Sequence, residues 1–196
     1  MKNIIHSIFF IIIQVSIALS QTQPDSVQEW NKLGAAWQKF ISNPIESNGL
    51  RVYSLLPNEN YGIVEPDSAF HNTWESIYDN LYKLESLVQK QNRIAVKVSF
   101  KLYSISDADF TETLDQILGR LIRTNPKLFL EELKLHRELV GNLSGILGNL
   151  GEKFVDEEDL SKKEIIKRIQ SLEKVKSKSL IGIRDECIIE LKSQIQ

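Results

Sequence analysis

The chain has 196 residues, of which 42% are hydrophobic and 26% are charged, and its formal net charge is −2. This length and composition predict one folded domain with a sizeable apolar core, and they exclude an intrinsically disordered chain. The nearly balanced charge gives no indication of a surface for nucleic acid or anionic membranes, so neither is expected as a partner.

The first twenty residues have the order of a secretory signal peptide. Lys2 precedes an apolar stretch over 4–19, and small side chains stand at Ala18 and Ser20. Signal peptidases accept small side chains at the first and third positions before the cut, so we expect cleavage between Ser20 and Gln21. Loss of Lys2 leaves a net charge of −3, and residues 21–196 are then expected to form a single helical domain.

A retained membrane anchor is the alternative interpretation of the same segment. Its apolar run covers roughly 16 positions, whereas a spanning helix needs about 20. Polar residues interrupt the run, among them His6 and Gln14, and no basic cluster follows it. The pattern therefore favours an exported chain, periplasmic or secreted, with no stable membrane anchor after cleavage.

Cys187 is the single cysteine, so no disulfide can form within the chain. On a helix it would lie beside Ile183 and Ile188, which predicts a buried thiol that acts as a small hydrophobic side chain. Pairing between two chains is the alternative. Because short extracellular eukaryotic domains more often carry disulfides, we expect a bacterial envelope protein.

The first element expected in the mature chain is an amphipathic helix over 25–42, with Asp25 as its N-cap. Its apolar positions recur at three- and four-residue steps and are Val27, Trp30, Leu33, Trp37, Phe40 and Ile41. The stretch 50–64 mixes apolar residues with helix breakers, which predicts a short helix and then an ordered loop. A helix over 73–91 follows, with Asn72 as N-cap and Glu75 completing a capping box.

The segment 94–102 (IAVKVSFKL) fits two structures. Its alternation of apolar and polar or small residues is typical of a half-buried strand, and a strand here would make the fold α+β. Read as a helix, it places Ile94, Val98 and Leu102 on one face and Val96 and Phe100 on the other, which suits a helix between two layers. We expect the helix, because a strand needs partners and only the 50–64 region offers any.

Further helices are expected from 107 to the C-terminus. Asp107 or Asp109 is the predicted N-cap of a helix that ends at Arg123-Thr124, and Asn125-Pro126 begins the next. Glycines at 141, 145, 148 and 151 predict a flexible or tightly turned connection. Ser161 and Glu164 form a second apparent capping box, and a last helix is expected over 180–191. The predicted fold is therefore all-α, a layered bundle of antiparallel helix pairs.

Two of these pairs, over 72–103 and 107–139, each combine a helix, a tight turn and a second helix. They resemble the units of HEAT or armadillo α-solenoids, and the segment 92–97 (NRIAVK) is similar to the start of a second HEAT helix. The resemblance covers about residues 72–140. It implies stacked antiparallel helices with a binding surface, and it implies no catalytic residue.

The sequence contains none of the common catalytic or phosphate-binding motifs, such as GxSxG, HExxH, CxxC or GxxxxGK. Two histidines remain in the mature chain. His136 follows Glu132 by four positions, a spacing that can bind a metal or tune an imidazole, although a solvated surface pair is the simpler expectation. His71 precedes the expected cap at Asn72 and is expected in a loop.

Two other features have simple structural interpretations. The acidic run 156–159 lacks the ligand spacing and the central glycine of a calcium loop, so we expect a solvated linker. Trp30, Trp37 and Trp74 have helical core spacing, which favours packing over a ligand groove.

Export, helical layering and missing catalytic motifs lead to a first hypothesis: a non-enzymatic module that binds a protein or peptide and has no cofactor or metal. The second hypothesis is a small hydrolase or metal-dependent enzyme with a site around His71 or His136. A structural subunit is the third. The identity of the ligand and the oligomeric state are not encoded in any motif.

Overall fold

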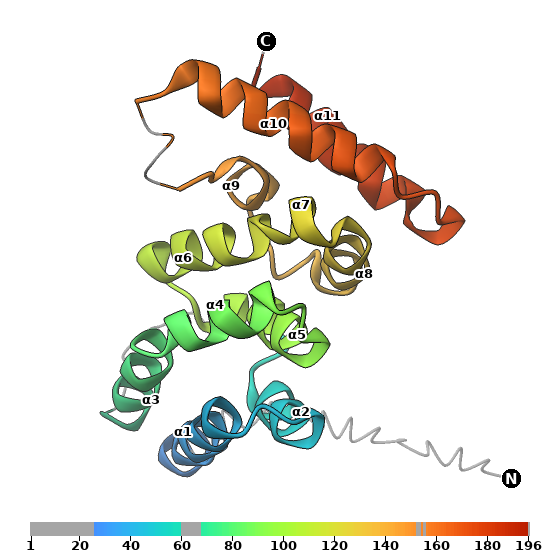
Figure 1. The fold of residues 1–196 in the computed structure, drawn as a ribbon. Helices are drawn as coiled ribbons and strands as arrows, with labels where there is room; N and C mark the ends of the chain where they lie inside the picture. Colours follow the sequence, from blue (N-terminus) through green and yellow to red (C-terminus); the bar gives the residue numbers. More distant parts are fainter. Residues whose placement is uncertain (1–25, 60–67, 152–153, 155, 196) are drawn as a thin grey trace, which may run out of the picture.

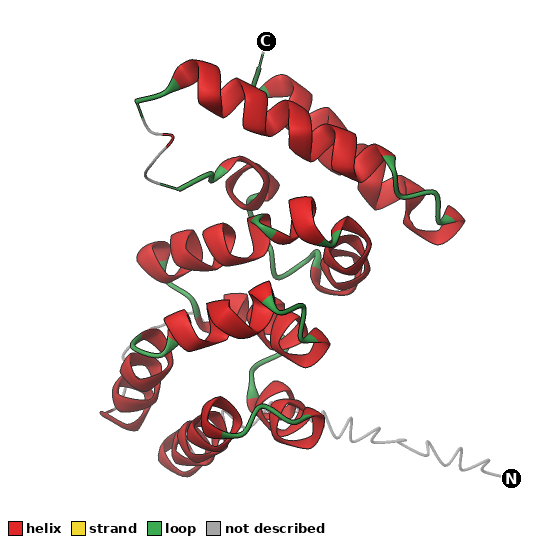
Figure 2. Cartoon of the chain, in the orientation of Figure 1, coloured by secondary structure: helices red, strands yellow, loops and turns green. Residues whose placement is uncertain are grey.

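The computed structural model describes residues 26–59, 68–151, 154 and 156–195. This part of the chain is all-α and contains no strand (Figure 2), which confirms the predicted fold class. The expected signal peptide, its cleavage site between Ser20 and Gln21, the cap at Asp25 and the end of the 50–64 loop lie outside the described residues. None of the helices in the described ranges is both long and apolar enough to cross a membrane.

The described helices follow one another with short connections. In chain order they are α1 (Ser26–Ser42), α2 (Glu46–Leu55), α3 (Ser68–Tyr78), α4 (Leu81–Gln89), α5 (Arg93–Leu102), α6 (Ala108–Gly119), α7 (Leu121–Thr124), α8 (Pro126–His136), α9 (Leu143–Gly148), α10 (Glu158–Glu173) and α11 (Ile181–Ser193). Short 3-10 turns, η1 (Tyr103–Ile105) and η3 (Lys178–Leu180), extend α5 and precede α11.

Successive helix pairs stack in layers along the chain (Figure 1). α1 packs against α2, α4 against α5, α7 against α8, and α10 against α11. Between layers, α2, α5, α8 and α11 form one continuous row of contacting helices, while α1 contacts α3, α4 contacts α6 and α7, and α7 contacts α10. The short α9 fills the space between α6 and α11. The result is a two-row stack with the apolar core between the rows.

Helix α5 lies at the centre of this stack. Asn92 caps it by accepting a hydrogen bond of 3.1 Å from the backbone N–H of Ala95. Nearly every side chain from Ile94 to Leu102 is buried, on both faces of the helix. The expected helix over 94–102 is therefore confirmed, and the strand alternative is wrong. Its alternating pattern reflects a helix that is covered all round, because neighbouring layers bury both faces.

The buried apolar residues form one cluster that runs from Trp30 in α1 to Leu191 in α11. Trp30 packs edge-on against Phe70, with ring centroids 4.7 Å apart, and Trp37 is fully buried with its indole N–H donating to the Ser76 carbonyl at 3.1 Å. Packing was the expected role of both tryptophans, and it is confirmed. Cys187 is also buried, and burial raises the pKa of its thiol to about 12.

The helix expected over 73–91 is wrong in its start and in its continuity. The structure has two helices there, separated by a turn at Asp79 and Asn80, and Asn72 lies inside α3 instead of capping it. Ala69 and Phe70 are buried against α1, which stabilises helix upstream of Asn72. Asn80 donates its side-chain N–H to the Ser76 carbonyl at 2.8 Å, and such side-chain competition favours a break.

The second expected capping box is also wrong. α10 begins at Glu158, so Ser161 lies within the helix and donates its hydroxyl to the Phe154 carbonyl at 2.8 Å. In contrast, Asp107 and Asn125 do cap α6 and α8, accepting from the backbone N–H groups of Phe110 and Leu128. The glycine-rich connection over 141–151 contains α9, a helix that the glycine pattern did not predict.

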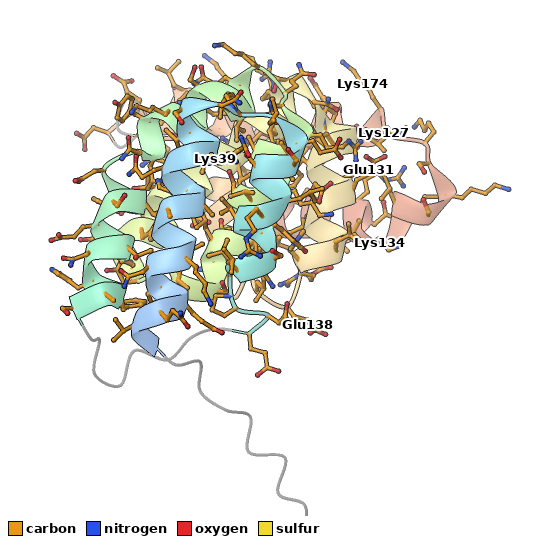
Figure 3. All side chains as sticks on the ribbon, turned by 90° about the horizontal axis from the view of Figure 1, so that it is seen from below. Lys39, Lys127, Glu131, Lys134, Glu138 and Lys174 are labelled. Atoms are coloured by element: carbon orange, nitrogen blue, oxygen red, sulfur yellow. The ribbon has the colours of Figure 1, made fainter. Side chains whose placement is uncertain are left out.

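Helix α8, in the row formed by α2, α5, α8 and α11, has one side exposed to solvent. Seen from below, Lys127, Glu131, Lys134 and Glu138 follow one another along one side of the molecule (Figure 3). The Lys127 ammonium lies 3.8 Å from the Glu131 carboxylate, one helical turn later. The opposite side of α8 is buried against the core, so this helix is amphipathic.

Candidate functional site

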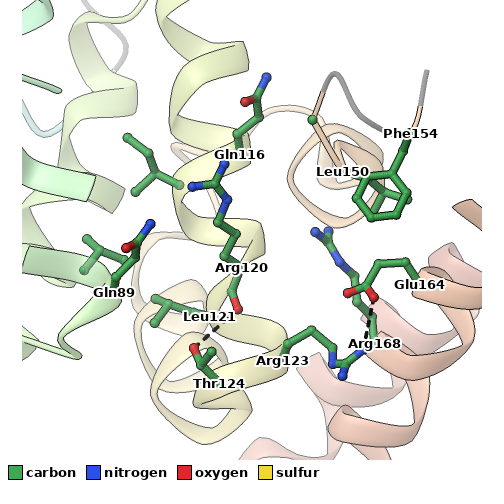
Figure 4. A pocket seen from close by; sticks show the side chains of 13 residues that line it. Gln89, Gln116, Arg120, Leu121, Arg123, Thr124, Leu150, Phe154, Glu164 and Arg168 are labelled. Atoms are coloured by element: carbon green, nitrogen blue, oxygen red, sulfur yellow. Dashed lines mark hydrogen bonds and ion pairs between the residues drawn. The ribbon is translucent and has the colours of Figure 1, made fainter. Parts of the chain in front are cut away.

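A cleft of about 740 Å³ opens between α4, the α6–α7 region and α10, so that it spans three layers of the stack (Figure 4). Its walls combine apolar side chains, such as Ile117 and Leu150, with the amides of Gln89 and Gln116. A neighbouring hollow of about 260 Å³ shares Gln116, Leu150 and Gly151 with it. The two together form one elongated depression, which we call the arginine cleft after the side chains described next.

Three arginines line the arginine cleft from two sides. Arg120 and Arg123 project from the α6–α7 region and Arg168 from α10, and Figure 4 shows all three beside the same opening. Arg123 forms an ion pair with Glu164 at 3.1 Å across the cleft, and Arg120 pairs with Glu85 of α4. These pairs link α10 to α7 and α4 to the α6–α7 region.

Arg168 differs from the other two because its side chain is buried, with only 3% of its surface exposed. Its Nη1 donates to the Leu147 carbonyl at 2.6 Å and its Nη2 to the Asn149 carbonyl at 3.4 Å, while Nε has no hydrogen-bond partner in the described structure. No carboxylate of the described residues lies at ion-pair distance from it. Desolvation lowers the pKa of Arg168 to about 10.

Gly119, the last residue of α6, makes room for this guanidinium. A Cβ there would lie 2.7 Å from the Ile146 carbonyl oxygen and 3.0 Å from Nη1 of Arg168. The bare glycine lets α9 and Arg168 approach the α6 backbone directly. The position of Arg168 is therefore built by α6, α9 and α10 together.

His136 belongs to a separate buried cluster between α2, α5 and α8. Its Nδ1 lies 2.8 Å from the Glu132 carbonyl oxygen, so Nδ1 carries the proton, and Nε2 accepts a hydrogen bond of 2.9 Å from the Tyr53 hydroxyl. Phe100 stacks on the imidazole with ring centroids 5.8 Å apart. The expectation of a solvated surface pair is wrong for His136, because α2 and α5 cover this face of α8.

Charged groups surround this cluster. The Glu132 carboxylate is buried, 3.9 Å from Nδ1 of His136 and 3.5 Å from Arg93, and burial raises its pKa. The ammonium groups of Lys97 and Lys101 lie 4.8 and 5.5 Å from the centre of the Tyr53 ring. With 3% of its surface exposed, the His136 side chain contacts a substrate only after Tyr53 or Phe100 has moved.

His71 lies on the exposed side of α3 and pairs with Glu75 at 3.0 Å, so its expected place in a loop is wrong. The helix starts earlier than Asn72 and includes it. The structure does not bring the two histidines together, since their hydrogen-bond and ion-pair partners lie on different elements. The described residues contain no group of three or more His, Cys, Asp or Glu side chains placed to hold a metal ion.

The sequence motifs did not point to the arginine cleft. Arg120 and Arg123 are one helical turn apart, as are Glu164 and Arg168, but this spacing is ordinary on solvated helices. Only the stacking of α10 beside α7 brings the two pairs together. The acidic run 156–159 is exposed as expected, but its second half is not a linker, because α10 begins at Glu158, which pairs with Lys162.

No protein-family model, curated protein or solved structure matches this chain. Its function must therefore be inferred from the geometry and chemistry of its own surfaces.

Proposed function

We propose that this chain is a non-enzymatic binding module of the bacterial envelope, or secreted beyond it, and that it holds a segment of a protein or peptide in the arginine cleft. The observation that carries the proposal is the cleft itself, which extends over three successive helix layers. Elongated concave surfaces of this kind arise when helix pairs stack, and they suit extended ligands.

The walls of the arginine cleft support a peptide ligand. The amides of Gln89 and Gln116 and the hydroxyl of Thr124 line it beside Ile117, Leu121 and Leu150. Amides can pair with the backbone N–H and C=O groups of a peptide, and the apolar walls can cover its side chains. The ion pair between Arg123 and Glu164 links α7 to α10 at the wall of the cleft.

Panning a phage-displayed library of random peptides, about twelve residues long, against the mature chain tests this proposal. Gln116→Trp places a large ring in the cleft, and we expect it to weaken binding of the selected peptides by about tenfold or more. Gln28→Trp on the exposed side of α1 is the matched control and should bind like the wild type. The proposal fails if no peptide is selected, or if the selected peptides bind both variants equally.

Export is tested separately. Expression of the full chain in a bacterium with an intact secretion system should yield a periplasmic or extracellular protein whose first residue is Gln21. Cytoplasmic protein that still begins at Met1 would contradict the expected export.

A further inference from the structure

We infer that the arginine cleft recognises a carboxylate on the bound peptide, with Arg168 at its floor and Arg120 at its mouth. This inference rests on the proposed function and names the chemistry of its ligand. It implies that acidic segments of a partner, or its free C-terminus, are selected over neutral ones.

The charges around the cleft do not balance. Among the described residues, its lining contains three arginines and one glutamate, Glu164, which is paired with Arg123. Arg120 is paired with Glu85, which is outside the lining. Arg168 is then the one cation of the lining with no carboxylate at ion-pair distance among the described residues. The cleft therefore offers a positive site to an incoming anion.

The environment of Arg168 strengthens this preference. Its guanidinium donates to two backbone carbonyls, which orient it but do not neutralise its charge. Its Nε has no acceptor among the described residues. A buried charge without a counter-ion is costly, and the fork of a guanidinium matches the two oxygens of a carboxylate. An anion in the cleft would compensate that charge. Only 3% of the Arg168 surface is exposed, so a carboxylate reaches Nε only after a neighbouring side chain has moved.

Arg120 has the properties of a second contact at the entrance. Its side chain is about half exposed, and its partner Glu85 is also accessible to solvent. Surface ion pairs of this kind contribute little stability, so a ligand carboxylate can compete with Glu85 at small cost. The half-exposed Arg120 at the mouth and the buried Arg168 at the floor together define a path for an anionic group.

A small probe tests the anion site without any selected peptide. N-acetylglutamate amide, added to the mature chain at constant ionic strength, should shift the Nε–Hε NMR signal of Arg168, while N-acetylglutamine amide should not. The Arg120→Gln variant should weaken the response by about tenfold, and Arg51→Gln, at an exposed position of α2, should leave it unchanged. Equal responses to the two probes, or none to either, would overturn the inference.

The peptides selected by panning allow a second test of the carboxylate assignment. Replacing each Asp or Glu of a bound peptide by its amide, one at a time, should identify one position that costs about tenfold in affinity. Cleft-dependent binding that every amide analogue retains would overturn the carboxylate assignment and leave the proposed function standing. A peptide with phosphoserine at the sensitive position tests whether the cleft recognises phosphate instead of carboxylate. If the peptide binds only in its phosphorylated form, the carboxylate assignment is also overturned.

The Arg168→Lys variant distinguishes ligand binding by the guanidinium from a purely structural role of Arg168. It keeps the positive charge but loses the bidentate fork. Circular dichroism and the NMR spectrum establish whether the variant remains folded. Weaker probe binding by a folded Arg168→Lys protein supports the inference, and unchanged binding contradicts the assigned role of the fork.

Discussion

The hydroxyl of Tyr53 donates a hydrogen bond of 2.9 Å to Nε2 of His136, joining α2 to α8 across 83 positions of sequence. The bond is inside the row of helices that α2, α5 and α8 form, and the two rings meet edge to face at 5.6 Å. It also sets the tautomer of His136, because Nδ1 donates to the Glu132 carbonyl and leaves Nε2 as the acceptor. This polar contact links the first layer of the stack to the third.

Removing the Tyr53 hydroxyl should show how much this hydrogen bond contributes to the free energy of unfolding. Tyr53→Phe keeps the ring that packs against Lys97 but leaves Nε2 of His136 buried without a donor. We expect the free energy of unfolding to fall by about 1–2 kcal/mol, measured by urea denaturation. Tyr82→Phe, on an exposed ring, is the control and should change nothing. Equal stability of the two variants would show that the hydrogen bond contributes nothing.

The pKa of His136 should lie below its ordinary value of 6.5. Desolvation by burial lowers it most, and the charges of Lys101 and Lys97 add to this, against the hydrogen bond to the Glu132 carbonyl. The unfolded chain then takes up a proton at higher pH than the folded one. This group therefore contributes stability that is complete above pH 6.5 and lost as the pH falls toward the folded pKa.

NMR titration of the imidazole signals of the mature chain, assigned with a His71→Gln variant, measures this pKa directly. The expected midpoint of His136 is below 6.5. A midpoint at or above 6.5 would contradict the buried, neutral imidazole that the structure describes.

The stability contributed by Asp115 should depend on pH in the opposite direction from that contributed by His136. Burial raises its pKa from 3.8 to about 6, although the 2.6 Å hydrogen bond from Tyr103 lowers it. The folded chain holds this proton more tightly than the unfolded one, so the contribution of Asp115 is complete below pH 3.8 and is lost as the pH rises to about 6.

Asp115→Asn removes this titration and keeps an oxygen that accepts from Tyr103. We expect the variant to gain stability relative to the wild type as the pH rises from about 4 to 6, by up to about 3 kcal/mol, in urea denaturation at several pH values. Comparing variant and wild type at each pH removes the contribution of His136, which both share. A flat difference between Asp115→Asn and the wild type across these pH values would disprove the raised pKa.

The close approach at Gly119 gives a prediction about packing. In Gly119→Ala the new methyl would be 2.7 Å from the Ile146 carbonyl oxygen, so α9 or Arg168 must shift. We expect thermal or urea denaturation to show a loss of about 1–3 kcal/mol. Gly182→Ala in α11 is the matched control. Apart from its chain neighbours and its own helix backbone, no atom of the described residues lies within 4 Å of the added Cβ, and helix propensity should raise stability by about 0.5–1 kcal/mol. A stabilising Gly119→Ala would show that the contact is not tight.

Local sequence patterns predicted most of the secondary structure correctly. The caps at Asp107 and Asn125 are confirmed because a short polar side chain meets an N–H only three residues away. The expected cap at Asn72 is wrong because Ala69 and Phe70 are buried upstream of it and extend α3. The expected cap at Ser161 is wrong because α10 already begins at Glu158 and the Ser161 hydroxyl donates to the Phe154 carbonyl. Cap motifs compete with packing, and at Asn72 packing decided the boundary.

The candidate sites depended on contacts that no local pattern contains. His136 looks like a surface residue from its neighbours in sequence, and only α2 and α5 bury it. Arg120, Arg123 and Arg168 are ordinary helical arginines until α10 packs beside α7.

The sequence by itself indicated most of the helices, favoured the all-α class and predicted the burial of Cys187, because hydrophobic periodicity and capping act within a few residues. Only the tertiary structure decided where a cleft opens and which cation in it lacks a counter-ion, because both depend on how distant helices stack.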